Sequence, residues 1–140
     1  MMEPRTLGYV EESCKGRLVA GERSASVRRV CTDSRLAKPG DLFVAIRGDR
    51  FDGHDYLGDA LGQGAEAAVV SQSRLSQAEA AGPTIEVEET REALGQLAAR
   101  YRLDFELPVV AVGGSNGKTG TKEILATVLG QRLKTLSSEA

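Results

Sequence analysis

The sequence lacks the features that mark membrane proteins and disulfide-rich secreted proteins. No apolar run in its 140 residues approaches the roughly 18–20 residues that cross a bilayer. The first twelve residues also lack the apolar core of a signal peptide. The two cysteines, Cys14 and Cys31, have neither metal-ligand nor redox spacing. We therefore expect a cytosolic protein with buried, reduced thiols.

A strong excess of charge of either sign is also absent. The chain has 18 basic and 20 acidic side chains, which gives a net charge of −2. This balance argues against a general nucleic-acid binder and against binding to anionic membranes. The charge is nevertheless segmented: residues 1–50 and 107–140 are net positive, and residues 51–106 are net negative. The two positive segments contain most of the motifs described below.

The composition is that of a chain able to build a packed core. Hydrophobic residues make up 41% and charged residues 27% of the chain, and the length suits one domain. Glycine is unevenly distributed, because four of the 16 glycines lie within eight residues near the end of the chain. These are Gly113, Gly114, Gly117 and Gly120. This cluster indicates a specialised loop.

Apolar periodicity predicts a mixed α/β chain. Helices are expected over about residues 5–13 and 55–65, from Thr90 to the residues before Pro108, and after the glycine cluster as far as Gly130. The helix after Thr90 is expected to bury Ala93, Leu94, Leu97, Ala98 and Tyr101. Strands are expected over residues 17–20, 26–30, 42–46, 67–70, 84–87 and 109–112, with a further strand near 133–136 and a short helix within 71–83. The run at 42–46 is apolar throughout, which is typical of a strand buried on both faces.

The glycine cluster stands between the predicted strand 109–112 and a predicted helix, which is the setting of a phosphate-binding loop. Glycines let main-chain N–H groups face phosphate oxygens, and the N-terminus of the next helix favours an anion. The general pattern requires a further glycine where this chain has Val112, so the motif is the shorter run 114–119. The residues expected to hold a nucleotide are Gly114, Ser115, Asn116, Gly117, Lys118, Thr119 and Gly120. Lys118 would reach the β- and γ-phosphates of ATP, and the Thr119 hydroxyl would bind Mg²⁺.

Residues 32–65 contain a second group of polar and cationic side chains in loops. Arg35, Arg47 and Arg50 can pair with a diphosphate, and Phe51 can contact a base. The alternative for each is structural, since Asp33 and Ser34 can cap a turn and surface arginines are usually solvated. The only histidine, His54, is more often a structural residue than a catalyst. These residues alone indicate a candidate cationic pocket.

The order of these motifs resembles the Mur ligase family, whose members form amide bonds with ATP during peptidoglycan precursor synthesis. The runs Asp-Ser-Arg at 33–35, Pro-Gly-Asp-Leu-Phe-Val-Ala at 39–45 and Asp-Gly-His at 52–54 precede Gly-Ser-Asn-Gly-Lys-Thr at 114–119. The resemblance covers residues 7–140. It is greatest to members that add D-alanyl-D-alanine to UDP-N-acetylmuramoyl-tripeptide through an acyl phosphate. Members that add the third amino acid share the first signature and are the alternative.

The resemblance implies how the chain is organised. Residues 1–106 would form an α/β domain, including a linking helix, that binds the UDP end of the substrate. Residues 107–140 would be the first strand, phosphate loop and helix of a central ATPase domain. Within the first segment, Thr32, Ser34, Asp49, Arg50 and Phe51 match positions that hold uridine diphosphate, beside the cationic Arg35. Lys118 is the expected catalytic residue, and Thr119 the metal ligand.

On this interpretation the chain is a fragment of the ligase and is expected to be inactive alone. The D-alanyl-D-alanine site would lie in further domains, and the oligomeric state is left open. The alternative from another class is a self-sufficient, non-catalytic nucleotide-binding module. Because the predicted strand 109–112 is apolar on both faces, residues 107–140 are expected to pack on the first domain, to self-associate or to be poorly ordered.

Overall fold

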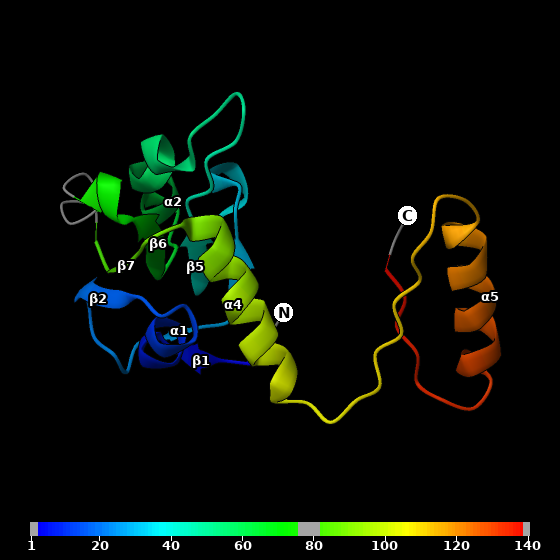
Figure 1. Cartoon of the computed structure of the whole chain (residues 1–140). Helices are drawn as coiled ribbons and strands as arrows, with labels where there is room; N and C mark the ends of the chain where they lie inside the picture. Colours follow the sequence, from blue (N-terminus) through cyan, green and yellow to red (C-terminus); the bar gives the residue numbers. More distant parts are fainter. Residues whose placement is uncertain (1–2, 76–81, 139–140) are drawn as a thin grey trace. The chain divides into compact units, whose positions relative to one another are not determined.

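The computed structural model describes residues 3–75 and 82–138, and the chain divides into two compact units, Met1–Phe105 and Glu106–Ala140 (Figure 1). The first unit contains a five-stranded sheet of order β2-β7-β6-β5-β4. Its strands are β2 (Arg17–Ala20), β4 (Arg29–Cys31), β5 (Asp41–Val44), β6 (Ala67–Ser71) and β7 (Thr84–Val87). β4, β5, β6 and β7 are parallel to one another, and the edge strand β2 pairs antiparallel with β7. The predicted mixed α/β class is confirmed.

The remaining elements of the first unit connect or cover this sheet. β1 (Arg5–Thr6) and β3 (Ser26–Val27) form a separate antiparallel pair. The helices are α1 (Leu7–Ser13), α2 (Leu57–Gly62) and α4 (Thr90–Leu103), with short 3₁₀ turns at Ser34–Leu36, Gly53–Tyr56 and Gln72–Arg74. The last turn lies in the predicted helical segment 71–83, of which residues 76–81 lie outside the described residues.

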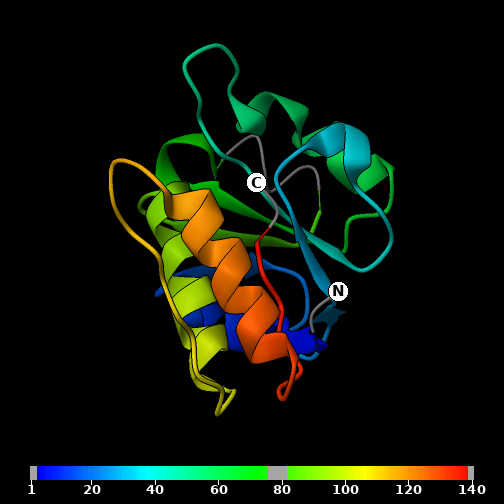
Figure 2. The ribbon, with the colours of Figure 1, turned by 90° about the vertical axis from the view of Figure 1, so that its right-hand side faces the viewer.

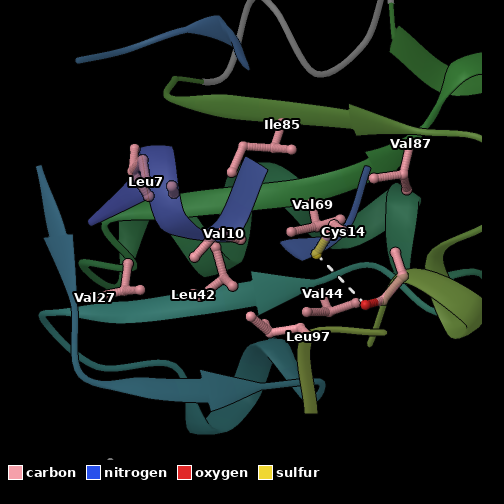
Figure 3. Close-up of a cluster of buried hydrophobic side chains, with 12 residues drawn as sticks. Leu7, Val10, Cys14, Val27, Leu42, Val44, Val69, Ile85, Val87 and Leu97 are labelled. Carbon is pink, nitrogen blue, oxygen red and sulfur yellow. Dashed lines mark hydrogen bonds between the residues drawn. The ribbon is translucent and has the colours of Figure 1, made fainter. Parts of the chain in front are cut away.

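Alternating side chains of the central strands supply two apolar clusters, one on each face of the sheet. Leu42, Val44 and Val69 pack with Leu7 and Val10 of α1 on one face, as Figure 3 shows. The same face is covered by Ala93 and Leu97 of α4. On the other face, α2 packs over the alternate strand residues, and that cluster consists of Ala37, Phe43, Ala45, Leu57, Ala60, Ala65, Ala68 and Val70. The apolar run at 42–46 is therefore buried on both faces because helices cover both.

Both cysteines are buried and free, as expected. The Cys14 thiol lies 3.5 Å from the carbonyl oxygen of Ala93, which accepts its hydrogen bond and joins α1 to α4 (Figure 3). Burial raises the pKa of the Cys14 thiol to about 11. Because the thiolate is the nucleophilic form of cysteine, this thiol has an inert packing role.

Three predicted elements differ in the first unit. The strand expected over 26–30 is two short strands in different sheets, because the Arg28 amide bonds to the Gly40 carbonyl oxygen at 2.8 Å, between β3 and β4. The helix expected over 55–65 is the shorter α2, which ends before Gly64, a residue with φ of +104°. The apolar face of α4 is narrower than predicted, since Ala98 is exposed.

The second unit contains one regular element in its described part, α5 (Lys118–Gly130). The strands predicted over 109–112 and near 133–136 do not form in residues 106–138. A strand acquires its hydrogen bonds from a neighbouring strand, and these segments have none within the described unit. Val109 and Val110, which were expected inside a sheet, are exposed. The helix after the glycine cluster is confirmed.

Candidate functional site

The first unit has an open hollow of about 490 Å³ lined by Thr32, Ile46, Gly48, Asp49, Arg50 and Phe51. Thr32 directly follows β4, and residues 46–51 follow β5. Because β4 and β5 are parallel neighbours, their carboxyl ends lie at the same edge of the sheet. Ligands of open α/β sheets bind at this edge, where loops leave the strands. The hollow is therefore where the topology favours a binding site.

The loop formed by residues 47–52, which we call the substrate loop, is held at its base by main-chain contacts. Arg47 and Asp52 form an antiparallel bridge, and the Gly48 amide donates to the Phe51 carbonyl oxygen at 2.9 Å. Figure 2 shows the loop, drawn in teal, extending away from the sheet. Phe51 is 69% exposed, so its ring is accessible to a ligand. A planar base can stack on such a ring.

Gly53 fixes the position where the substrate loop returns to the sheet. Its amide donates to the Ile46 carbonyl oxygen at 3.0 Å. A Cβ atom at this position would lie 2.8 Å from the main-chain nitrogen of Ile46, which is too close. Only glycine therefore allows the two main-chain segments to approach this closely.

Asp52 and His54 connect the substrate loop to the end of β6. Asp52 caps the turn Gly53–Tyr56 by accepting from the His54 amide at 3.0 Å. Its carboxylate also contacts His54 Nδ1 at 2.5 Å and accepts from Arg74 at 3.0 Å. Burial raises the pKa of the Asp52 carboxyl, but the hydrogen bonds from the ring and the amide of His54, together with the charge of Arg74, outweigh burial, and the net pKa is lowered.

Ser34 and Arg35 lie in the turn after β4 and are not among the residues that line the hollow. Ser34 is buried, and Asp33 caps the turn by accepting from the Arg35 amide at 3.1 Å. The Arg35 guanidinium bonds to the same carboxylate at 2.6 Å and holds the pKa of Asp33 below its usual value. Four of the six predicted substrate residues thus meet at the hollow, and Ser34 and Arg35 form the adjoining turn.

An ion pair with one buried partner, which the sequence did not reveal, supports this turn. Asp41, at the start of β5, is buried and bonds to the Arg29 guanidinium, including Nε at 2.8 Å. Arg29 also donates to the Leu36 carbonyl oxygen at 2.8 Å, at the end of the turn. Hydrogen bonding from Arg29, opposed by burial and aided by the Lys38 amide, lowers the pKa of Asp41. The available signal was Asp41 itself, a charged residue placed directly before a continuous apolar run.

Two further residues of the site carried weaker signals. Ile46 lines the hollow beside Gly48, although the sequence indicated only a buried strand there. Arg91, in the first turn of α4, donates to the Arg47 carbonyl oxygen at 3.2 Å and so supports the base of the substrate loop from another element. A sequence separation of 44 residues gives no local pattern that could reveal this contact.

The predicted phosphate loop lies in the second unit. Gly114 and Gly117 have φ of +141° and +73°, and Gly117 is the N-cap of α5. Positive φ at these positions explains the two glycines. Lys118 Nζ donates to the Gly114 carbonyl oxygen at 2.6 Å, so the side chain folds back over the loop. Thr119 and Gly120 lie in the first turn of α5, and residues 113–121 are all exposed.

Residues 3–75 and 82–138 contain neither a metal-binding cluster nor a membrane-spanning helix. Within these ranges no three His, Cys, Asp or Glu side chains are grouped so that they could hold a metal ion. None of the helices described there has the length and apolar character needed to cross a membrane.

The sequence has close curated relatives. It is 40% identical over 123 residues to the UDP-N-acetylmuramoyl-tripeptide–D-alanyl-D-alanine ligase of Synechocystis, covering 86% of this chain and 26% of that protein. It is 39% identical over 131 residues to the ligase of the same name from Escherichia coli, covering 94% of this chain and 28% of that one. A UDP-N-acetylmuramoyl-L-alanyl-D-glutamate–2,6-diaminopimelate ligase of Syntrophomonas wolfei is 39% identical over 111 residues. This match covers 78% of this chain and 22% of that protein. The chain thus spans under a third of the length of these relatives.

Solved structures and a family profile agree with these relatives. MurF from Acinetobacter baumannii matches with a TM-score of 0.82 and 35% identity, covering 94% of this chain and 28% of that one. MurF ligase from Thermotoga maritima, solved in complex with ADP, matches with a TM-score of 0.63 and 38% identity over 76% of this chain and 24% of that one. The profile described as "Mur ligase family, catalytic domain" matches residues 26–102, more than half of the chain. The chain belongs to the Mur ligase family.

Proposed function

We propose that the chain is part of an ATP-dependent ligase that joins D-alanyl-D-alanine to UDP-N-acetylmuramoyl-tripeptide, through an acyl phosphate. The observation that carries the proposal is the hollow at the carboxyl ends of β4 and β5. It brings together four residues that the resemblance to the Mur ligase family assigned to the UDP end of such a substrate. The names of the relatives at 39–40% identity support the same activity.

The hollow has the chemistry that a uridine diphosphate group requires. Arg50 supplies a guanidinium for the diphosphate, and the exposed ring of Phe51 supplies a stacking surface for uracil. Thr32 and Asp49 supply a hydroxyl and a carboxylate for the uracil edge or the ribose. Ser34 and Arg35, in the adjoining turn, complete the proposed substrate set. Residues 1–106 are accordingly proposed as the substrate-binding domain.

Residues 107–140 are proposed as the beginning of the ATP-binding domain. Main-chain N–H groups of 114–117 and the N-terminus of α5 would hold the phosphates, together with Gly120 in the first turn. Lys118 Nζ would leave the Gly114 carbonyl oxygen for the β- and γ-phosphates. The Thr119 hydroxyl is a hard oxygen donor, which fits Mg²⁺ when phosphates and water supply its other ligands. When bound, Mg²⁺ neutralises charge on the transferring phosphoryl group, and Lys118 aids it there.

A calorimetric titration of the 140-residue chain with UDP-N-acetylmuramoyl-tripeptide tests the proposed site. We expect Arg50→Ala to weaken binding by about tenfold or more, since it removes a charge-assisted contact. The matched control is Lys118→Ala, which should leave the affinity for this ligand unchanged and remove Mg²⁺-dependent ATP binding. No heat with wild-type protein at millimolar ligand, or equal weakening by both variants, would contradict the assignment.

The second candidate is the ligase that adds the third amino acid. The diaminopimelate ligase of Syntrophomonas wolfei, at 39% identity, favours it specifically. Assaying the full-length gene product with D-alanyl-D-alanine against 2,6-diaminopimelate, each with its own UDP-linked acceptor, separates the two. Phosphate release that depends on D-alanyl-D-alanine supports our proposal. Phosphate release that depends on the diamino acid supports the alternative. If neither substrate gives phosphate release, the result supports a non-catalytic nucleotide-binding module.

A further inference from the structure

His54 has a set of hydrogen bonds that the proposed substrate contacts leave unexplained. The side chain is buried, and both ring nitrogens have partners. Nδ1 lies 2.5 Å from an Asp52 carboxylate oxygen. Nε2 lies 3.0 Å from the main-chain nitrogen of Ser71 and 3.1 Å from its Oγ. The ring therefore bridges the end of the substrate loop and the last residue of β6.

These contacts determine the protonation state of the ring. A main-chain N–H can only donate, so Nε2 must present its lone pair to Ser71. The ring is then neutral, and its single N–H is on Nδ1, where it donates to Asp52. A second proton on Nε2 would place two N–H donors against each other. The bond from the Ser71 amide to Nε2 consequently exists only with the neutral imidazole.

Asp52 connects the protonation state of the His54 ring to the hollow. Asp52 is the residue that pairs with Arg47 at the base of the substrate loop, and residues 48–51 between them line the hollow. Arg91 holds the other end of the loop through the Arg47 carbonyl oxygen. Loss of the bond from the Ser71 amide therefore leaves Asp52 held from the β6 side through Arg74 alone, while Arg91 still holds the other base residue.

We infer that His54 is a positioning residue whose neutral form holds the substrate loop in the conformation that receives the UDP end of the substrate. Protonation of the ring breaks the contact with the Ser71 amide and weakens that binding. The inference rests on the proposed function of the hollow, and extends it with a proton-dependent affinity.

Charged groups lie beside the ring and its Asp52 partner. Among the described residues these groups are Asp52 and Asp55 on its own segment and Arg74 on the turn after β6. Arg74 bonds to Asp52 at 3.0 Å and lies 3.8 Å from Asp55. The Ser71 amide donates to Nε2 at 3.0 Å.

The same atoms have the order of a Ser-His-Asp nucleophile, but they do not form one. A general base needs a free lone pair to remove the hydroxyl proton. Here the main-chain N–H of Ser71 shares the Nε2 lone pair with its own Oγ. Ser71 Oγ also contacts Ser73 Oγ at 3.2 Å. The arrangement is that of a structural link between two segments.

The chain has a single histidine, so its imidazole signals in an NMR spectrum belong to His54 without further assignment. In the ligand-free chain we expect ring nitrogen-15 shifts of a neutral imidazole protonated on Nδ1. On acidification, the Ser71 amide and the amides of residues 48–51 should shift together with the ring. A ring protonated on Nε2 at neutral pH, or a ring that titrates while these amides remain unmoved, would overturn the inference without reference to any ligand.

The binding experiment measures affinity for UDP-N-acetylmuramoyl-tripeptide, whose diphosphate diester and carboxylates keep their charges near neutral pH. Wild-type affinity is expected to fall by up to about tenfold on acidification from about pH 8 to about pH 5.5. His54→Asn keeps an N–H donor near the Nδ1 position, and His54→Gln keeps an oxygen acceptor near the Nε2 position. Both variants should bind several-fold more weakly at about pH 8, with no pH dependence over this range.

Asp52→Asn separates an effect of charge from a loss of packing, because only an effect of charge changes the pH at which binding weakens. The variant keeps an acceptor for Nδ1–H but removes the carboxylate charge, so the acidic limb of the binding profile should move to lower pH. A flat wild-type profile with measurable binding would overturn the role of His54 and leave the proposed function intact. Absence of binding at every pH, with the expected ring titration, would instead contradict the proposed function. An acidic limb that persists in both His54 variants would assign the proton to another group.

Discussion

In the first unit, apolar side chains of adjacent strands are buried on both faces of a sheet, whereas in the second unit similar side chains are exposed to solvent. Phe43 and Val44 are each 1% exposed, and Val110 is 65% exposed. The segments 42–46 and 109–112 look alike in the sequence, since both are continuous apolar runs bounded by turn residues. The difference lies in their neighbours, because β5 has strands on both sides and residues 109–112 have none within the described unit.

The two predicted binding sites differ in the same way. The hollow of the first unit depends on contacts between distant segments, including those of His54 with Ser71 and of Arg91 with Arg47. The phosphate loop of the second unit depends on local features, namely two glycines with positive φ at the start of α5. Long-range contacts require the whole sheet, whereas a helix start forms from residues close together in the sequence.

The largest effect is expected from removing a buried side chain of the central strand. Phe43→Ala should lower the free energy of unfolding of the first unit by about 3–5 kcal/mol, through lost burial and the cavity that remains. Val110→Ala, the matched change in the second unit, should alter it by less than about 0.5 kcal/mol. Urea denaturation followed by circular dichroism measures both. Equal destabilisation by the two variants would show that residues 109–112 are also packed.

The next largest effect is expected at Gly53. Gly53→Ala should destabilise the first unit by about 1–3 kcal/mol, because the new Cβ meets the main chain of Ile46. It should also weaken binding at the hollow, since the base of the substrate loop must shift. Gly113→Ala is the control from the second unit, where a Cβ meets no described atom within 4 Å. An unchanged melting temperature for Gly53→Ala would contradict the close approach.

The Arg29–Asp41 pair makes the stability of the first unit depend on pH. Because the pKa of Asp41 is lowered in the folded protein, its contribution is present above the unfolded pKa of about 4 and is lost as the pH falls below it. Asp41→Asn should cost about 1 kcal/mol at neutral pH, a modest figure because the Arg29 side chain is 38% exposed. The difference from wild type should shrink on acidification, as thermal unfolding across the pH range would show. A constant difference would exclude an electrostatic origin.

The smallest effect is expected from a glycine inside α4. Gly95→Ala should raise the stability of the first unit by about 0.5–1 kcal/mol, since alanine favours helix and the Cβ position is open. Gly120→Ala, in the first turn of α5, should raise helix content without shifting the unfolding transition of the first unit. Thermal melts and far-ultraviolet circular dichroism separate these effects. A shift of that transition by Gly120→Ala would couple the two units.

Much of the first unit was predictable because its signals are local. Apolar runs indicated β5, β6 and β7, and helical periodicity indicated α1 and α4. The failures have physical causes. The segment 26–30 alternates like one strand, but the bond from Arg28 to Gly40 divides it between two sheets. The predicted strand 109–112 has the right residues for a buried strand and no partner strand with which to form it.

The residues of the candidate site also divide into those that the sequence predicted and those whose roles depend on contacts between distant segments. The resemblance to the Mur ligase family predicted Thr32, Asp49, Arg50 and Phe51, which the fold brings to one hollow. His54 was expected to be a structural residue only because a single histidine is more often structural than catalytic. Its partner Ser71 is 17 residues away, and the ion pair of Asp41 with Arg29 spans 12. Such contacts leave no periodic pattern in the sequence.

The sequence alone determined where helices, strands and loops follow one another. Glycines, prolines and apolar runs act on neighbouring residues through dihedral preferences and burial. The sequence therefore located the helices and most strands and predicted the phosphate loop, whereas the candidate substrate residues came from the resemblance to the Mur ligase family. Only the tertiary structure decided which apolar runs are buried, which tautomer His54 adopts and how the substrate loop is held. These depend on pairing between distant segments, and a hydrogen bond across a sheet is formed only when the strands beside it are present.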